Sequence, residues 1–246
     1  MDAITFPVVE RFVSVNGEGL RAGRLAAFVR MAGCNLTCTW CDTSWANETA
    51  CPRSDLNADQ LVEWVSATCV SCVTLTGGEP ALQPGLAQLI EALYTSDAWG
   101  NGDERIIEIE TNGSVDLGLL HDLRVRLERE HASFAGSYPR TVVAFTVDCK
   151  LPSSGMASEM YAANYAFLSH DDAVKFVVAS QVDLEAAQAV VCEQDLCATT
   201  NVFFSPVFSC IEPVDIVRFM ETHYLSQVRL QLQMHKIIWP DVEKGV

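Results

Sequence analysis

The chain has 246 residues, of which 49% are hydrophobic, so it can bury one sizeable core, and we expect a single domain over residues 1–246. Its 32 acidic and 16 basic residues give a formal net charge of −16 without a basic stripe, which argues against a nucleic-acid partner. No apolar run approaches the roughly 20 residues of a membrane helix, and the N-terminus lacks the pattern of a secretory signal, so we expect a cytoplasmic protein without a membrane partner.

Apolar runs and amphipathic stretches alternate along the chain. The apolar runs predict strands at 26–31, 73–76, 106–110, 142–147, 173–178, 201–205 and 228–234. The amphipathic stretches predict helices at 58–67, 86–94, 117–130, 184–192 and 214–224, the first of them capped by Asn57. This order indicates an α/β fold with six or seven mostly parallel strands and outer helices. Such a sheet can curl into an incomplete barrel rather than close as eight strands.

The suggestive polar segments follow the predicted strands. They are the loop from residue 33 to 43 and the segments 76–80, 110–113, 148–150, 205–208 and 235–236. Loops that leave the carboxyl ends of parallel strands converge on one mouth, so the sequence predicts a single site there. Four cations stand at or near predicted strands of this acidic chain, where an anionic small molecule could use some of them: Arg30, Lys150, Lys175 and Lys236.

Three cysteines share the first of these loops. Cys34, Cys38 and Cys41 are spaced as CxxxCxxC and have no fourth cysteine nearby. Three thiolates that hold an iron–sulfur cube leave one iron open to a small cofactor. The alternative is a zinc site or a set of buried thiols, although structural zinc normally takes four ligands in two paired spacings.

The other cysteines form no second complete metal pattern. Cys69 and Cys72 make a CxxC before a strand, and Cys192 and Cys197 flank the end of a helix. Either pair could hold a metal, but each lacks a partner pair, so we interpret them as free thiols in a reducing compartment.

The cysteine loop, Thr76-Gly77-Gly78-Glu79-Pro80 and Glu110-Thr111-Asn112-Gly113 together resemble the motifs of the radical S-adenosylmethionine (SAM) superfamily. The resemblance implies a partial TIM-type barrel, a [4Fe-4S] cluster, SAM that is split to a 5′-deoxyadenosyl radical, and a flavodoxin- or ferredoxin-like one-electron donor. It also implies SAM or cluster contacts at Trp40, Cys41, Asp42, Gly77, Gly78, Glu79, Glu110, Asn112, Asp148, Cys149, Lys150, Ser205, Pro206, Val207 and Phe208.

Three further segments narrow the resemblance to one family. Residues 12–19, Cys41-Asp42-Thr43 and residues 231–239 are similar to those of the 7-carboxy-7-deazaguanine synthases. The likeness implies conversion of 6-carboxy-5,6,7,8-tetrahydropterin to 7-carboxy-7-deazaguanine with loss of ammonia, a step on the route to queuosine. It also implies magnesium as a further cofactor and a homodimer as the assembly.

Family likeness and side-chain chemistry together suggest catalytic roles for Glu18, Arg30 and His235. Glu18 could accept two hydrogen bonds from the amino-pyrimidinone edge of the pterin, and Arg30 could grip its carboxylate with both ends of its fork. His235 and Gln233 are expected on one face of the last strand. The remaining substrate contacts are expected at Val15, Asn16, Gly17, Thr76 and Val246.

We assign Thr43 to magnesium, which prefers hard oxygen ligands and keeps several waters, and the neighbouring Asp42 could be a competing ligand. Simpler interpretations stay open for several of these residues. Thr43, Glu18 and the Gly77-Gly78 pair could each belong to an ordinary turn, and the C-terminal tail could be frayed. At the level of function, the alternatives are an activase that installs a glycyl radical on a partner protein, and a non-catalytic metal-binding protein.

Overall fold

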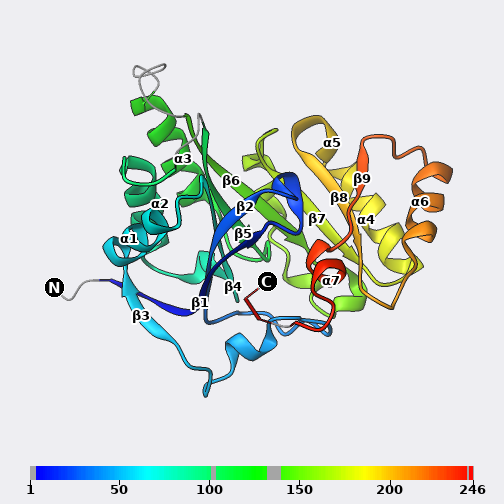
Figure 1. Cartoon of the computed structure of the whole chain (residues 1–246). Coiled ribbons are helices and arrows are strands. Elements are labelled where there is room, and N and C mark those ends of the chain that lie inside the picture. Colours follow the sequence, from blue (N-terminus) through cyan, green and yellow to red (C-terminus); the bar gives the residue numbers. More distant parts are fainter. Residues whose placement is uncertain (1–3, 101–103, 132–139, 243, 246) are drawn as a thin grey trace.

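A mixed sheet of nine strands runs through the part of the chain that the structure, a computed structural model, describes, namely residues 4–100, 104–131, 140–242 and 244–245. The strand order is β3-β1-β2-β4-β5-β6-β7-β8-β9. Figure 1 shows that the sheet is curved and that its two edges do not meet. The predicted α/β fold with an incomplete barrel is therefore confirmed.

From β2 to β9 in the order of the sheet, each strand pairs in parallel with the next. These strands are β2 (Leu25–Met31), β4 (Cys72–Gly77), β5 (Glu104–Thr111), β6 (Arg140–Cys149), β7 (Ala173–Val178), β8 (Asn201–Pro206) and β9 (Val228–Leu230). Each overlaps a predicted strand. Two antiparallel strands that the sequence analysis did not predict, β1 (Thr5–Val15) and β3 (Ser54–Asn57), extend the sheet beyond β2.

Helices cover the outer face of the sheet, with α1 to α3 at one end and α4 and α6 at the other (Figure 1). The long ones are α1 (Ala58–Thr68), α2 (Leu86–Thr95), α3 (Gly118–His131), α4 (Gln181–Glu193) and α6 (Pro213–Thr222). The predicted cap of α1 is confirmed, because Asn57 and Gln60 exchange side-chain and backbone hydrogen bonds. Two short helices, α5 (Leu196–Thr199) and α7 (Met234–Ile238), were not predicted. No helix within the described ranges has both the length and the apolar character to cross a membrane.

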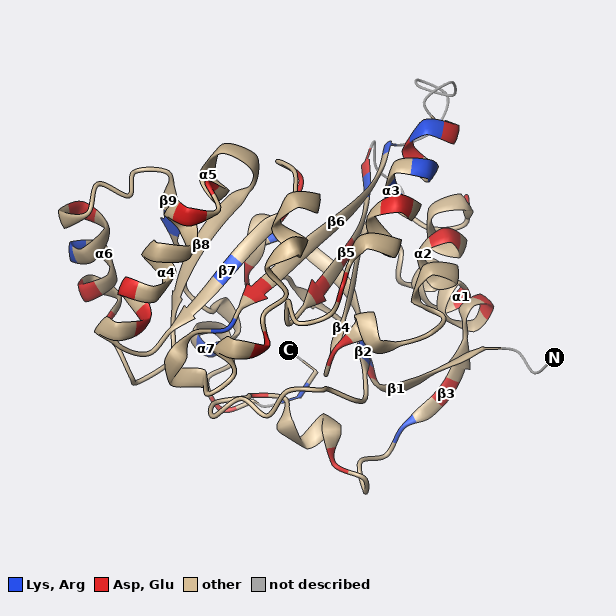
Figure 2. Cartoon of the chain, turned by 180° about the vertical axis from the view of Figure 1, so that it is seen from behind, with Lys and Arg blue, Asp and Glu red and all other residues tan. Residues whose placement is uncertain are grey.

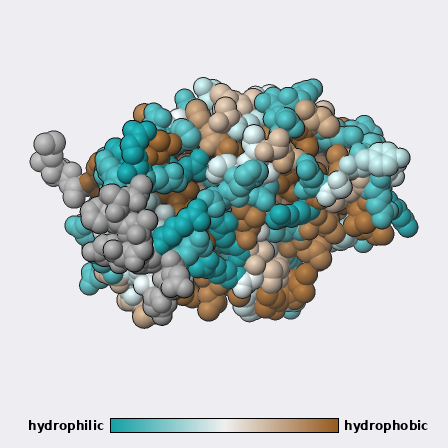
Figure 3. Space-filling model, turned by 90° about the horizontal axis from the view of Figure 1, so that it is seen from above, coloured by the Kyte–Doolittle hydropathy of each residue, from teal (hydrophilic) through white to brown (hydrophobic). Residues whose placement is uncertain are grey.

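The main hydrophobic core lies between the sheet and these helices, where strand side chains such as Leu75, Ile107 and Phe176 pack with Leu89 and Leu184. At the surface, hydrophilic and hydrophobic residues are mixed, as the view from above shows, with hydrophobic atoms gathered toward its lower edge (Figure 3). The inner face of the sheet differs from the hydrophobic core and from the outer surface. It carries buried polar side chains, among them Thr74, Glu108 and Thr146.

The last strand ends earlier than predicted. β9 stops at Leu230, and α7 begins at Met234, so Gln233 and His235 do not share one face of a strand as the sequence analysis expected. The backbone N–H of Gln231 still donates to the carbonyl of Phe204 in β8 at 2.9 Å. Its side chain, however, is bound to the turn after β1, where it accepts a hydrogen bond from the backbone N–H of Gly19 at 2.7 Å and donates one to its carbonyl at 3.1 Å. The pairing with β8 therefore ends at Gln231, and the chain continues along that turn into α7.

The turn after β1 closes the open side of the barrel. In addition to the two bonds between Gln231 and Gly19, the backbone N–H of Met234 donates to the carbonyl of Gly17 at 3.3 Å. Asn16 reaches across to the inner face of the sheet and donates to Glu108 at 2.6 Å. Segments from the two ends of the chain thus meet where a complete barrel would have further strands.

A buried ion pair fastens α3 to the sheet. Arg124 Nη1 lies 2.8 Å from both carboxylate oxygens of Asp172, and the backbone N–H groups of Phe145 and Ser169 donate to the same carboxylate. Asp172 is fully buried. Arg124 is the one cation of the described residues that is paired with this buried negative charge.

We expect Arg124→Met to destabilise the folded apoprotein by about 3–5 kcal/mol, because Asp172 would keep a buried charge without its partner. Urea unfolding followed by circular dichroism would measure this. The matched control is Arg126→Met on the same helix, which removes an exposed pair with Glu91 and should leave the midpoint nearly unchanged. Equal midpoints for the two variants would contradict the importance of the buried pair.

Candidate active site

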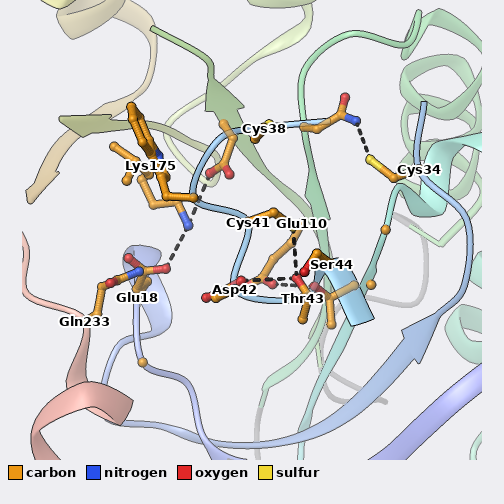
Figure 4. A pocket seen from close by; sticks show the side chains of 18 of the residues that line it. Glu18, Cys34, Cys38, Cys41, Asp42, Thr43, Ser44, Glu110, Lys175 and Gln233 are labelled. Carbon is orange, nitrogen blue, oxygen red and sulfur yellow. Dashed lines mark hydrogen bonds and ion pairs between the residues drawn. The ribbon is translucent and has the colours of Figure 1, made fainter. Parts of the chain in front are cut away.

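A cavity of about 600 Å³ opens at the carboxyl ends of the parallel strands. Its walls come from the turn after β1, the loop after β2, the ends of β4, β5, β6 and β7, and the segment that contains α7 (Figure 4). The predicted site residues that line it are Val15, Asn16, Gly17, Glu18, Arg30, Cys34, Cys38, Trp40, Cys41, Asp42, Thr43, Thr76, Gly77, Gly78, Glu110, Asn112, Asp148, Cys149, Lys150, Gln233 and His235.

A smaller group of predicted site residues lies away from the lining. Glu79, Ser205, Pro206 and Val207 are buried, and Phe208 is 67% exposed at the surface. Val246 lies outside the described residues. Two of this group contact residues of the cavity wall: the Ser205 hydroxyl donates to Glu18 at 3.2 Å, and the Glu79 carboxylate accepts hydrogen bonds from Thr111 and Asn112.

Cys34, Cys38 and Cys41 are free thiols that all face this cavity. The sulfur of Cys34 accepts hydrogen bonds from the backbone N–H of Leu36 at 3.4 Å and from the side-chain amide of Asn112 at 3.5 Å. Hydrogen bonds to sulfur are among the interactions that tune iron–sulfur clusters, so the donor set fits a cube held by three thiolates. In the described ranges no three His, Cys, Asp or Glu side chains are grouped as a single metal ion would need.

The glycines of the Gly77-Gly78-Glu79 segment allow two backbones to touch. A Cβ atom at Gly77 would collide with Met31, and one at Gly78 would collide with Gly33. Instead, the N–H of Gly78 donates to the carbonyl of Met31 at 2.9 Å, and that of Glu79 donates to the carbonyl of Gly33 at 2.7 Å. The glycine pair therefore fixes the start of the cysteine loop against the end of β4.

The side chain of Glu79 ties β4 to β5. It is fully buried and accepts hydrogen bonds from the Thr111 hydroxyl at 2.8 Å and the Asn112 backbone N–H at 2.6 Å. Burial raises the pKa of this carboxyl, although the hydrogen bonds oppose that effect. Its visible role is to hold Asn112 beside the sulfur of Cys34.

A chain of alternating charges crosses the cavity floor. Lys175 Nζ lies 2.8 Å from Glu18 Oε2 and 3.2 Å from Asp148 Oδ1, and Lys150 Nζ lies 2.7 Å from Asp148 Oδ2. Figure 4 shows Lys175 above Glu18, and Figure 2 shows its basic position in β7 beside the acidic ends of neighbouring strands. Glu18 is thus held in place by a buried ammonium group.

The charges of this chain stabilise one another. Burial alone would lower the pKa of Lys175, but Asp148, Glu18 and Glu110 hold that pKa well above its ordinary value. Burial likewise favours the neutral form of Asp148, yet Lys150 and Lys175 keep its pKa below the ordinary value. Asp148, Lys150 and Lys175 therefore remain ionised near neutral pH.

Glu110 differs from these residues because it has a weaker set of partners. It accepts a hydrogen bond from the Thr76 hydroxyl at 2.7 Å. Burial raises its pKa to about 7, and the attraction of Lys175 only partly offsets that effect. A carboxyl group in the cavity can therefore gain or lose a proton near neutral pH.

Three predicted site residues differ from expectation. Arg30 and Thr43 already have partners within the protein, and His235 lies on a helix instead of a strand. Arg30 Nε forms an ion pair with Glu10 at 2.9 Å. The Thr43 hydroxyl donates to Asp42 at 3.1 Å. His235 belongs to α7, and burial lowers its pKa, so the imidazole is neutral at neutral pH.

The sequence analysis gave Lys175 no defined role and did not consider Glu10 at all. A signal for Lys175 was present, because it is the single charged residue in the apolar run Ala173–Val178. A charge in a buried strand needs a partner, which points to the polar inner face. Glu10 had no comparable signal, since its strand β1 was not predicted.

Comparisons with known proteins agree with this geometry. A model of the Radical SAM superfamily matches residues 28–137. A 7-carboxy-7-deazaguanine synthase of Clostridium acetobutylicum is 41% identical over 99% of this chain and 100% of that protein. One from Chlorobaculum tepidum is 33% identical over 97% of this chain and 96% of that protein. The crystal structure of QueE from Escherichia coli matches with a TM-score of 0.64 and 20% identity, covering 93% of this chain and 94% of that one, which supports the fold.

We expect the burial of Glu110 to make stability depend on pH. Its pKa rises from 4.5 to about 7 on folding, so the unfolded chain loses this proton first and the folded state loses stability as the pH rises across that window. Glu110→Gln cannot titrate. The melting temperature of this variant minus that of the wild-type apoprotein should therefore increase between about pH 4.5 and pH 7 and then level off.

Differential scanning calorimetry across that range would check this prediction. Glu63→Gln, which changes an exposed carboxyl on α1, is the matched control and should follow the wild-type profile. If the difference between Glu110→Gln and wild type stays constant from pH 4.5 to 7, Glu110 does not hold its proton as its burial indicates.

Proposed function

The chain belongs to the 7-carboxy-7-deazaguanine synthase family of the radical SAM superfamily, and we propose that its substrate is 6-carboxy-5,6,7,8-tetrahydropterin, bound in the cavity that Glu18 and the three cysteines share. It is a radical SAM enzyme of queuosine biosynthesis that uses a [4Fe-4S] cluster and SAM. This membership overturns both alternatives from the sequence analysis, the glycyl-radical activase and the non-catalytic metal-binding protein.

The observation that carries the proposal is the common cavity. Cys34, Cys38 and Cys41 would hold the cluster, which when bound supplies the electron that splits SAM. Glu18 lies at the same cavity on a different segment, at the end of a turn that bridges the open side of the barrel. A flat ring held at Glu18 would therefore face the cofactor without leaving the cavity.

Glu18 suits the amino-pyrimidinone edge of a pterin. Its Oε2 is paired with Lys175, which supports the ionised carboxylate that accepts hydrogen bonds best. In the described part of the chain, its Oε1 takes only the 3.2 Å hydrogen bond from Ser205. Because the two partners fix the carboxylate from one side, it can present its remaining lone pairs to the ring.

Glu110 would donate or accept a proton during loss of ammonia. An amine leaves more easily when it is protonated, and a carboxyl with a pKa of about 7 inside the cavity is suited to give or take a proton at neutral pH. Burial at the end of β5 is what provides this property.

The finer features of the resemblance remain part of the proposal. Thr43 would contribute a hydroxyl to magnesium, with water and substrate oxygens as the other ligands. A flavodoxin- or ferredoxin-like protein would supply the electron, and two copies of the chain would form a homodimer in the cytoplasm.

Product formation is the direct test of the function. The anaerobically reconstituted protein, given carboxytetrahydropterin, SAM and a reductant, should form 7-carboxy-7-deazaguanine and ammonia. Cys38→Ala should abolish this product and also the cleavage of SAM to 5′-deoxyadenosine, because the cluster loses a ligand. Cys192→Ala removes an exposed thiol on α4 and should keep both reactions. Cleavage of SAM by the wild type without any deazaguanine would refute the proposed substrate.

Magnesium binding at Thr43 has its own test. Thr43→Val keeps the shape of the side chain but removes the hydroxyl, so half-saturation of activity should need about 10- to 100-fold more magnesium. Thr43→Ser, which retains the oxygen, should stay close to wild type. Magnesium titration of product formation measures both. An unchanged magnesium requirement in Thr43→Val would place the ion elsewhere.

A further inference from the structure

Arg30, to which the family resemblance gives the pterin carboxylate, lines the cavity near the end of β2 with one edge of its fork already in use. Its Nε donates to Glu10 Oε2 at 2.9 Å, and only 15% of the Arg30 side chain and 14% of the Glu10 side chain are exposed. Among the described residues, neither terminal nitrogen of the fork has a polar partner, and neither of them is buried. The guanidinium is therefore fixed at Nε and open to a ligand at its outer edge.

A β-bulge places Glu10 beside Arg30. In the pairing of β1 with β2, Val8 lies opposite Met31. Glu10 lies opposite Arg30, so the register shifts by one residue between the two pairs. Val8 packs into the core beneath the helices, and regular alternation would turn Glu10 to that same side. The extra residue instead turns Glu10 to the inner face, where it meets Arg30.

An aromatic ring supports the same guanidinium from a second direction. Arg30 Cζ lies 5.8 Å from the ring centre of Phe12, within the range of a cation–π contact. Phe12 is stacked on Phe28 of the cavity wall, with ring centres 4.9 Å apart and planes inclined by 6°. Glu10 is not among the described residues that line the cavity, so it acts on a ligand through Arg30.

Arg30 stands on the wall that a pterin carboxylate would reach. Glu18 is held by Lys175 of β7, which is separated from β2 in the sheet by β4, β5 and β6. In a pterin, a 6-carboxylate is at the end of the ring system opposite to the amino-pyrimidinone edge. A ring held by that edge at Glu18 therefore directs its carboxylate across the cavity, away from β7 and toward the side of Arg30.

We propose that Glu10 is a positioning residue for Arg30, which fixes the fork at Nε and leaves both terminal nitrogens for the two oxygens of the pterin carboxylate. This inference rests on the proposed function. A bidentate contact needs two parallel N–H groups, and a guanidinium that is held before the ligand arrives loses less conformational freedom on binding. Glu10 thereby sets the preference for a carboxylated pterin.

The experiment measures binding rather than turnover. Dissociation constants of 6-carboxytetrahydropterin and of tetrahydropterin, which lacks the carboxylate, would be measured anaerobically on the cluster-loaded enzyme with SAM present. Glu10→Leu removes the acceptor, and Glu10→Gln keeps an acceptor oxygen without the charge. The matched control is Glu104→Leu, which removes a glutamate paired with Arg24 at the opposite ends of the strands.

We expect Glu10→Leu to weaken binding of the carboxylated pterin about 3- to 10-fold, because the ligand must then order the fork itself. Binding of tetrahydropterin should change less than about twofold in the same variant. Glu10→Gln should keep at least the wild-type preference for the carboxylated pterin, and Glu104→Leu should leave it unchanged.

A double-mutant cycle tests whether the effect passes through Arg30. In an Arg30→Met background, Glu10→Leu should no longer alter the ratio of the two dissociation constants. Glu10→Asp serves if Glu10→Leu does not fold, because it keeps the charge of the pair and shortens the side chain by one methylene. It should weaken the carboxylated pterin selectively, in the same direction as Glu10→Leu.

Several results would overturn the assignment. Tighter binding of the carboxylated pterin in Glu10→Leu would make Glu10 a competitor for the charge of Arg30. Equal changes for both pterins, or no change for either, would make Glu10 a structural residue of the sheet, as would an effect that persists in the Arg30→Met background. Failure of the proposed function has a different signature, because the wild type would then bind neither pterin or form no deazaguanine from the one it binds.

Discussion

Lys175 is the residue on which the polar interior depends. Its ammonium group contacts Glu18 and Asp148 at once, and these carboxylates come from segments that are 130 residues apart in the sequence. Without a cation between them, the two carboxylates would repel each other in a buried setting, and one would take up a proton. Lys175 thereby fixes the position of Glu18 relative to the strand that ends at the cofactor side of the cavity.

The same region explains how an unfinished barrel can enclose a cavity. The sheet edges at β3 and β9 are not joined, so strands alone leave the interior open. The turn before Gly19 fills this side, since Gln231 bonds to Gly19 and Asn16 reaches Glu108. Gln231 joins the sheet to this turn, because its backbone N–H donates to Phe204 of β8 while its side chain is bonded to Gly19.

The regular part of the fold was predictable from the sequence because it follows local patterns. Apolar runs such as Ala173–Val178 marked the parallel strands, and Asn57 marked the start of α1. β1 was missed because its alternation is interrupted by Glu10 and Arg11, and its pairing with β2 carries a bulge between Val8 and Glu10. The local sequence does not show that Glu10 of β1 and Arg30 of β2 will form an ion pair.

The candidate site was predictable in its motifs but not in its contacts. The cysteine spacing and Gly77-Gly78 pointed to loops that line the cavity, because each motif is short and continuous. The partner of Arg30, the role of Glu79 as a tie between strands, and the break before α7 all depend on residues distant in sequence. Such contacts follow only from the assembled sheet.

Glu108 and Glu110 show how the assembled sheet separates a carboxyl that is enclosed by protein groups from one that faces the cavity. Both point to the inner side of β5, and burial raises the pKa of both. Glu108 has Asn16 at 2.6 Å on one oxygen and Thr146 at 2.7 Å on the other, and it lies off the cavity wall. Among the described residues Glu110 has a single hydrogen-bond donor, Thr76, and it faces the cavity. Two residues of one strand thus differ because only the second retains free lone pairs where a ligand can reach them.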